Sequence, residues 1–169
     1  EALAKTARED RELMGTPAAY RDELRCSVYR TERLISVAGT YYTYTGGAHP
    51  NTILLSWNFD LETGTYFTPA MLDAEAGLHD TVLRALKEQA RQRAKEAGQG
   101  PREFFWEDYQ DTLANWSNYA VSFDEEGMNV GFSPYELACY AAGPQVFQVP
   151  YADLQECLSE QGRALLGLE

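Results

Sequence analysis

The chain has 169 residues, of which 44% are hydrophobic and 24% are charged. This length supports one domain with a full core, whereas two independent cores are not expected. Acidic residues outnumber basic ones by 26 to 14, which gives a formal net charge of −12. Such a surface repels phosphate backbones and anionic membranes and attracts basic partners, so we expect no nucleic-acid partner. The simpler explanation of the charge is that it keeps the protein soluble.

The sequence carries no recognisable targeting or membrane signal. No apolar run approaches the length of a membrane span, and no basic segment followed by an apolar one opens the chain. Because the first residue is Glu1 rather than Met, we expect the chain to be an excised or processed piece of a longer protein. The missing targeting signal then says nothing about where the full protein resides.

The three cysteines, Cys26, Cys139 and Cys157, show no paired C-x-x-C spacing. A disulfide between Cys139 and Cys157 would fit because both belong to one C-terminal unit. Free, partly buried thiols are the favoured interpretation. Cysteine usage therefore leaves the cellular compartment open.

The first third of the chain predicts a helix and two strands. Residues 1–14 are rich in Ala, Glu, Arg and Leu, which is typical of a helix, and the segment Gly15–Pro17 would end it. Apolar and polar positions alternate over residues 23–28, as in a half-buried strand. After a turn at residues 31–33, residues 34–45 predict a long strand.

A conformationally constrained loop follows that strand. Gly46 and Gly47 adopt positive φ at little cost, while Pro50 fixes its own φ at about −65° and biases His49 towards an extended backbone. We expect this loop to present its polar atoms in fixed positions. The alternative is that the glycines serve turn geometry alone.

The next strand is expected over residues 53–59. Every second position on it is large and apolar, so we expect this face of the strand to lie in a core. The residues of this face are Ile53, Leu55, Trp57 and Phe59. A turn at residues 60–64 and a short strand at 65–68 complete an antiparallel meander of four strands.

The clearest helix of the chain is predicted at residues 78–94, with Asp73 or Asp80 as its N-terminal cap. Its apolar positions recur at helical spacing and its end is marked by the Gly-rich segment 98–101. The basic residues between these ends are expected on a solvated face. They are Arg84, Lys87, Arg91, Arg93 and Lys95.

An aromatic run at residues 104–109 predicts a second, short helix packed on the sheet. Alternating apolar residues on both sides of Gly127 then predict a hairpin formed by residues 118–124 and 128–132. A compact loop bounded by prolines follows at residues 132–144.

Residues 146–149 predict a last strand, and Pro150 would begin a terminal helix whose leucines face inward. The predicted fold class is therefore α+β. We expect an antiparallel meander sheet that is covered on one face by one long helix and one or two shorter helices.

Two segments, residues 41–64 (YYTYTGGAHPNTILLSWNFDLETG) and 118–154 (NYAVSFDEEGMNVGFSPYELACYAAGPQVFQVPYADL), resemble a bacterial extracytoplasmic domain. This domain occurs in RsiV-type anti-sigma factors and as an accessory module of PdaC-type peptidoglycan deacetylases. The resemblance covers roughly residues 34–154, and residues 18–33 look like the strand pair that precedes the domain in the same proteins.

The resemblance implies a single domain over residues 1–169, in which an N-terminal helix and strand pair (1–33) precede an RsiV-like core (34–169). RsiV-like proteins are membrane-anchored, with this domain outside the cell membrane, and their domain binds lysozyme. Many other relatives are lipoproteins or cell-surface proteins, so the resemblance implies a location at the cell surface in either form. The resemblance thus implies an extracytoplasmic sensor or binding domain without cofactor. No transmembrane or sigma-binding segment is present here, so the anti-sigma role itself does not carry over.

In this resemblance the glycine-rich loop and the proline-bounded loop reach the cleft of the partner. The candidate partner-binding residues are Tyr44, Thr45, Gly46, Gly47, His49, Ser133, Pro134, Tyr135, Glu136 and Tyr140. Relatives commonly have proline where this chain has Cys139, a departure that predicts a less rigid second loop.

Catalytic and metal-binding patterns are weak. Only two histidines are present, and His79 has no second ligand at the i+4 position, so no zinc-helix motif exists. A triad of His49 with Ser56 or Ser133 and Asp60 can be drawn, but no nucleophile elbow supports it. We therefore expect neither catalysis nor a metal site.

Three functional hypotheses follow from these observations. The first is an extracytoplasmic binding or sensor domain whose partner is lysozyme or another basic protein. The second is an accessory module that binds cell-wall glycan or peptidoglycan fragments, favoured if the tyrosines and Trp57 share an open face. The third is a hydrolase centred on His49.

Overall fold

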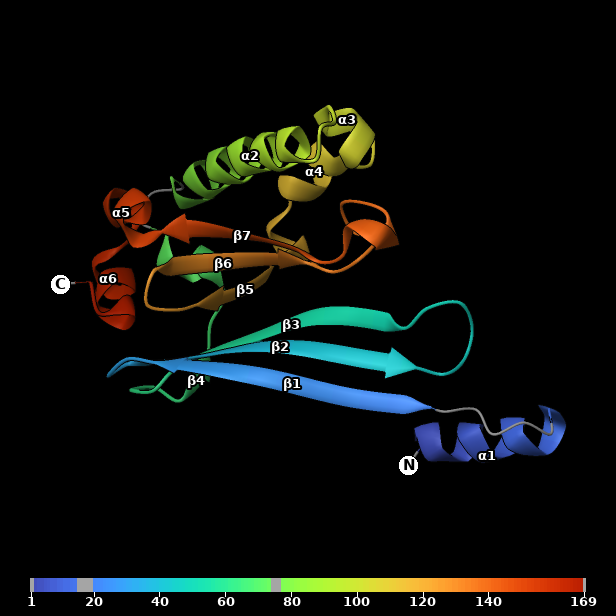
Figure 1. Cartoon of the computed structure of the whole chain (residues 1–169). Helices are drawn as coiled ribbons and strands as arrows, with labels where there is room; N and C mark the ends of the chain where they lie inside the picture. Colours follow the sequence, from blue (N-terminus) through green and yellow to red (C-terminus); the bar gives the residue numbers. More distant parts are fainter. Residues whose placement is uncertain (1, 15–19, 74–76, 169) are drawn as a thin grey trace.

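The computed structural model describes residues 2–14, 20–73 and 77–168. As predicted, the fold is of the α+β class. The strands do not form the one predicted sheet but are divided between two antiparallel sheets, and the long helix covers the second sheet instead of the four-stranded meander (Figure 1). The four-stranded sheet has the order β1-β2-β3-β4, with β1 at Arg21–Arg30, β2 at Leu34–Tyr44, β3 at Asn51–Asp60 and β4 at Thr65–Tyr66. The three-stranded sheet has the order β5-β6-β7, with β5 at Ala120–Phe123, β6 at Gly127–Phe132 and β7 at Gln145–Pro150.

The longest helix and the two short helices that follow it lie on one side of the three-stranded sheet, whereas the first helix and the last two lie elsewhere (Figure 1). The α-helices are α1 (Ala2–Met14), α2 (Leu78–Glu96), α3 (Pro101–Phe104), α4 (Tyr109–Leu113), α5 (Tyr151–Leu154) and α6 (Glu160–Leu166). Short 3-10 turns lie at Pro69–Leu72, Trp116–Asn118, Tyr140–Ala142 and Gln155–Cys157. Figure 1 shows three layers: α2 with its neighbours, then the three-stranded sheet, then the four-stranded sheet.

The predicted N-terminal elements are confirmed where the structure describes them. The helix predicted over residues 1–14 is α1, and the strand predicted over 23–28 is β1. The expectation that this strand is half-buried is wrong, because its apolar residues Leu24 and Val28 are exposed. The predicted helix end at Gly15–Pro17 lies outside the described residues. In the strand pair that follows, Arg21 lies opposite Tyr44 and Arg30 lies opposite Ile35, so the register is continuous over ten residues.

The core lies between α2 and the three-stranded sheet. The apolar stripe of α2 is fully buried, as its helical spacing predicts, and consists of Leu78, Val82, Leu86, Ala90 and Ala94. It faces the apolar side of β5, β6 and β7, whose residues include the buried Val130, Phe132 and Phe147. Burial of these side chains supplies most of the hydrophobic stabilisation of the fold.

The start of α2 is fixed by one of its two predicted caps. Asp73 Oδ1 accepts hydrogen bonds from the backbone N–H groups of Gly77, at 3.0 Å, and Leu78, at 3.2 Å. Asp80 instead lies inside the first turn, where its charge favours the positive end of the helix dipole.

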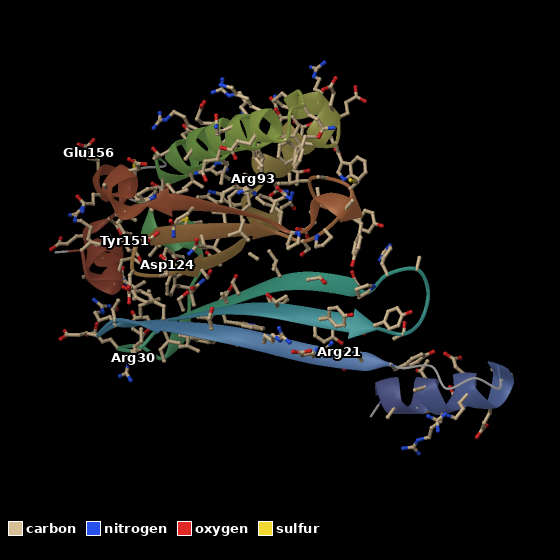
Figure 2. All side chains as sticks on the ribbon, viewed as in Figure 1. Arg21, Arg30, Arg93, Asp124, Tyr151 and Glu156 are labelled. Carbon is tan, nitrogen blue, oxygen red and sulfur yellow. The ribbon has the colours of Figure 1, made fainter. Side chains whose placement is uncertain are left out.

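Arg93 corrects the prediction that the basic face of α2 is wholly solvated. Its guanidinium donates to Gln145 Oε1 at 3.0 Å and to Val146 O at 2.8 Å. It also lies 4.5 Å from the centre of the Phe147 ring, between α2 and β7 (Figure 2). The charged group is held there because it satisfies a backbone carbonyl at the sheet edge.

The two shorter predicted helices are each broken by a contact with a distant part of the chain. The aromatic run divides into α3 and α4 because Phe105 is extended and bridges to Ala138. The terminal helix divides into α5 and α6 because Leu158 is extended and bridges to Asp73.

All three cysteines are free, as favoured, but only Cys157 is partly buried, whereas Cys26 and Cys139 are exposed.

The prediction that one face of β3 belongs in a core is wrong. Ile53, Leu55, Trp57 and Phe59 lie on the outer face of the four-stranded sheet, where Ile53 and Phe59 are exposed. The polar face, with the fully buried Asn58, points towards the three-stranded sheet instead. Alternation assigns residues to two faces of a strand, but it does not say which face is covered.

Polar side chains join the two sheets. Asn58 Nδ2 donates to Val121 O at 2.9 Å, and its Oδ1 accepts from Ser36 Oγ at 2.8 Å. Ser36 Oγ in turn accepts from Phe123 N at 2.8 Å. Since β5 is an edge strand, these contacts satisfy backbone groups that would otherwise lack partners in a buried place.

Candidate functional site

Two loops meet at one end of the molecule. The glycine loop, residues 44–50, joins β2 to β3, and the tyrosine loop, residues 133–144, joins β6 to β7. Figure 1 shows both loops at the same end of their sheets. The resemblance implies that both loops reach one partner, and the structure brings the loops together, because the Tyr135 hydroxyl is 3.1 Å from His49 Nε2.

Three aromatic side chains from the two loops form what we call the aromatic cluster: His49, Tyr135 and Tyr140. The rings of His49 and Tyr140 are stacked, with centroids 3.9 Å apart and an interplanar angle of 19°. The Tyr135 ring lies 6.0 Å from His49 and 5.8 Å from Tyr140. His49 and Tyr135 are exposed and Tyr140 is half-buried, so the cluster is a surface feature.

The hydrogen bonds of His49 assign its tautomer. Its Nδ1 is 2.9 Å from the carbonyl oxygen of Pro50, which can only accept, so we place the proton on Nδ1. Nε2 then accepts from the Tyr135 hydroxyl. The imidazole is thus oriented from both sides, by its own loop and by the tyrosine loop.

The glycine loop is held by a contact of its own. The Tyr44 hydroxyl donates to the Gly47 carbonyl at 2.9 Å. Gly46 and Gly47 have φ of 94° and 98°, a backbone conformation that residues with a side chain rarely adopt. These residues therefore shape the loop that presents His49, while Thr45 lies exposed beside them.

The tyrosine loop is anchored through Ser133 and Glu136. The Ser133 backbone N–H donates to the Glu136 carboxylate, and Ser133 Oγ accepts from Leu54 N on β3 at 3.1 Å. Burial raises the pKa of the Glu136 carboxyl above its ordinary value, although the hydrogen bonds from Ser133 act in the opposite direction. Pro134 is half-buried between these anchors and Tyr135.

Tyr135 presents its ring from a strained backbone. Its φ is 73°, and it is the one non-glycine residue with positive φ among the described residues. This conformation costs about 1–2 kcal/mol for a residue with a side chain. The indole N–H of Trp106 donates to the Tyr135 carbonyl at 2.9 Å, and the Trp106 backbone N–H donates to the Leu137 carbonyl at 2.8 Å.

The candidate residues divide into two groups. His49, Tyr135 and Tyr140 make the surface, whereas Tyr44, Gly46, Gly47, Ser133 and Glu136 hold the loops in shape. The residues predicted for this site do not include Trp106, which is exposed and hydrogen-bonded to the tyrosine loop. The aromatic run predicted a packed helix there, and no local pattern reveals a hydrogen bond to a residue 29 positions away.

The triad drawn from the sequence is not assembled. Asp60 is paired with Arg33, with Oδ2 at 3.1 Å from Nη2, at the far end of β3 from His49. A ten-residue strand spans about 30 Å, so Asp60 does not orient the imidazole. Among the described residues, no group of three or more His, Cys, Asp or Glu side chains could hold a metal ion.

No described helix combines the length and the apolar character that crossing a membrane requires.

The fold and the two loops define an α+β domain with an exposed aromatic surface at one end of its two sheets. Residues 67–152 match the model of the DUF3298 family, which is described as a protein family of unknown function. The chain belongs to this family.

Two solved structures of DUF3298 proteins resemble the chain. One, from Bacteroides fragilis, has a TM-score of 0.67 at 18% identity, and the match covers 99% of this chain and 66% of the other. The second, from Pseudomonas aeruginosa PAO1, has a TM-score of 0.60 at 17% identity and covers 92% of this chain and 70% of the other. Identities this low establish the fold alone, and the chain spans about two thirds of the length of the Bacteroides protein.

A search of curated proteins finds no match. The family match also divides the aromatic cluster, because residues 67–152 include Tyr135 and Tyr140 but not His49. The aromatic cluster is therefore built from both sides of that boundary.

Proposed function

We propose that the chain is a non-catalytic, extracytoplasmic binding domain that docks a basic protein partner, lysozyme being the first candidate, on the aromatic cluster. The observation that carries this proposal is the contact of His49 with Tyr135 and Tyr140, which joins two loops into one exposed surface. The resemblance of both loops to RsiV-type domains supports the location and the choice of partner.

The cluster has the physical properties of a docking surface. Tyrosine is enriched among the residues that dominate binding energy, because its ring buries a large area while its hydroxyl stays hydrogen-bonded. Here Tyr135 and Tyr140 are already held in place by His49 and by the loop anchors. A surface that is ordered before binding loses less conformational entropy when a partner arrives.

Charge favours a basic partner. The chain has a net charge of −12, and residues 44–50 and 133–144 contain no Lys or Arg. The one carboxylate in these loops is Glu136, which is an exposed residue. Opposite charges raise the rate of association and fix orientation, so we expect binding that weakens with salt but does not vanish.

A glycan is the second candidate ligand, and Trp106 is the observation that favours it. Trp106 is exposed and bonded to Tyr135, so it adds a fourth aromatic ring close to the cluster, of the kind that stacks on sugar rings. Trp57, by contrast, lies on the outer face of the four-stranded sheet and does not belong to this surface. Peptidoglycan fragments would then replace a protein as the ligand.

Calorimetry with a vertebrate lysozyme and with soluble muropeptides tests both candidates. We expect Tyr135→Ala and Tyr140→Ala each to weaken lysozyme binding at least about tenfold, the loss typical of a central anchor. Tyr66→Ala is the matched control, because Tyr66 is 51% exposed on β4 while Tyr135 is 52% exposed. The control is expected to change the affinity by less than about twofold.

Heat with muropeptides and none with lysozyme would select the glycan alternative. Equal losses in Tyr135→Ala and Tyr66→Ala, or binding that depends on salt and on neither loop, would contradict both candidates. Tyr135→Asn separates binding from folding, because Asn tolerates positive φ. We expect that variant to unfold at the same temperature or higher and to bind as weakly as Tyr135→Ala.

A further inference from the structure

The strand β1 forms a long free edge of the four-stranded sheet. It has ten residues, and within the part of the chain that the structure describes, β2 is its only strand neighbour. The side chains of Asp22, Leu24, Cys26, Val28 and Arg30 all lie on the outer face of the sheet. Figure 2 labels Arg21 and Arg30 at the two ends of the strand.

The backbone groups of these same five residues point away from β2. Thr31 N donates to Leu34 O at 3.0 Å where β1 and β2 join. Hydrogen-bonded and non-hydrogen-bonded pairs alternate along an antiparallel ladder, so the odd-numbered residues of β1 bond to β2. The even-numbered residues therefore leave their N–H and C=O groups on the free edge, where another strand can pair with them.

A second copy of β1 fits this edge in one register. If the strand runs antiparallel to itself with Cys26 opposite Cys26 of the second copy, Leu24 lies opposite the second copy's Val28. Asp22 then lies opposite the second copy's Arg30. Each pair forms twice about the twofold axis, and all the paired side chains share the outer face.

The paired residues are complementary in character. Leu24 is 53% exposed and Val28 is 64% exposed, so both are large apolar side chains without cover. Asp22 and Arg30 are exposed and oppositely charged. Moving the centre of symmetry by one residue, to Arg25 or to Ser27, places Asp22 opposite Val28 or Arg30 opposite Leu24, and the charge match is lost.

Local charge also favours contact between two copies at β1. The whole chain is strongly acidic, which opposes self-association. β1 carries three arginines, Arg21, Arg25 and Arg30, against Asp22 and Glu23, so this strand is not acidic. On the inner face Glu23 already pairs with both Arg21 and Arg25, which leaves no unbalanced acidic charge there.

We propose that two copies of this chain pair through β1 in the register centred on Cys26, forming a continuous eight-stranded antiparallel sheet. The contact uses none of the residues of the aromatic cluster, so it stands independently of the proposed function. Because the strands run antiparallel, the pairing leaves one aromatic cluster free at each end of the dimer.

Cysteine cross-linking tests the register directly. In the proposed dimer the two Cys26 Cα atoms lie about 5.5 Å apart, within the range that a disulfide spans. Copper phenanthroline with oxygen, which removes two electrons and two protons from a pair of thiols, is expected to give a covalent dimer. Cys26→Ser should abolish this product, whereas Cys139→Ser, which removes the other exposed cysteine, should leave it unchanged.

A charge exchange tests the pairing without cysteine chemistry. Sedimentation equilibrium of the unmodified chain under reducing conditions should show a mass of twice 19.0 kDa at high concentration. Asp22→Arg and Arg30→Asp each place like charges opposite each other, and we expect each to weaken dimerisation at least about tenfold. The double variant D22R/R30D restores opposite charges and should return to within about threefold of the original affinity.

Both positions are exposed, so circular dichroism is expected to show an unchanged fold in all three variants. A monomeric mass throughout the accessible concentration range would overturn the proposal. Cross-linking that requires Cys139 would also overturn it, as would a double variant that stays as weak as the single ones.

Discussion

The two sheets of this protein use their apolar faces in opposite ways. The three-stranded sheet turns its apolar face to α2 and buries it, with Phe132 and Phe147 fully inaccessible. The four-stranded sheet turns its apolar face outward and buries Ser36 and Asn58 instead. Whether the apolar face of a sheet is buried depends on which element packs against it. Helix α2 has one apolar stripe, and the three-stranded sheet packs against that stripe, so no apolar helix face is left for the four-stranded sheet.

We expect the largest difference in stability between the two sheets when one phenylalanine in each sheet is replaced by alanine. Phe147→Ala should lower the free energy of unfolding by about 3–5 kcal/mol, because it leaves a cavity under α2. Phe59→Ala should cost no more than about 1 kcal/mol, since Phe59 is 37% exposed. Urea unfolding of both variants measures the difference, and equal losses would show that the outer face is as well packed as the core.

A smaller effect is expected at the joint between the sheets. Asn58→Ala removes the donor to Val121 O and leaves Ser36 with one partner fewer, at a cost of about 1–3 kcal/mol. Ser56→Ala on the same face of β3 is the matched control, because within the described residues the Ser56 side chain has no hydrogen-bond partner. Thermal unfolding of the two variants compares them. If Asn58→Ala proves as stable as Ser56→Ala, apolar packing rather than polar contact holds the sheets together.

The smallest effect concerns acid stability at the end of the four-stranded sheet. Burial raises the pKa of Asp60, but hydrogen bonds from Glu62 N–H and from Arg33 outweigh it, so the net pKa is lower than usual. A lowered folded pKa stabilises the fold at pH values above the unfolded pKa of about 3.9, and this contribution is lost as pH falls through the folded value.

We therefore expect Asp60→Asn to be less stable than the unmodified chain at pH 7, with the gap closing at pH values below about 4. Urea unfolding at several pH values measures the slope. Asp153→Asn, at an exposed position on α5, serves as the control and should follow the unmodified chain. A gap that stays constant with pH would mean that the carboxylate of Asp60 contributes shape but not charge.

The sequence predicts the parts of this fold that local pattern controls. The helical spacing of α2 and the alternation around Gly127 place that helix and the β5–β6 hairpin correctly. The two loops are also located from sequence, because glycine and proline restrict the backbone wherever they occur. The resemblance implies that both loops reach one partner, and the structure places the two loops side by side through the contact of His49 with Tyr135.

The helix breaks and the buried face of β3 were not predicted, because each depends on contacts between residues that are far apart in the chain. Phe105 interrupts a helix because it bridges to Ala138, and Leu158 does so because it bridges to Asp73. Asn58 is buried because Val121, 63 positions away, needs a donor for its carbonyl. Periodicity carries no information on such partners, which is why the covered face of β3 was assigned to the wrong side.

Trp106 gives the aromatic surface a built-in optical reporter. Its indole N–H is bonded to the carbonyl of the residue that presents the Tyr135 ring, and the side chain is partly open to water. Of the two other tryptophans, Trp57 lies within the four-stranded sheet and Trp116 packs near His79 and Tyr119. A ligand that binds to the tyrosine loop is therefore expected to change the fluorescence emission of Trp106 more than that of the two other tryptophans. Binding titrations can then be followed without attaching a dye.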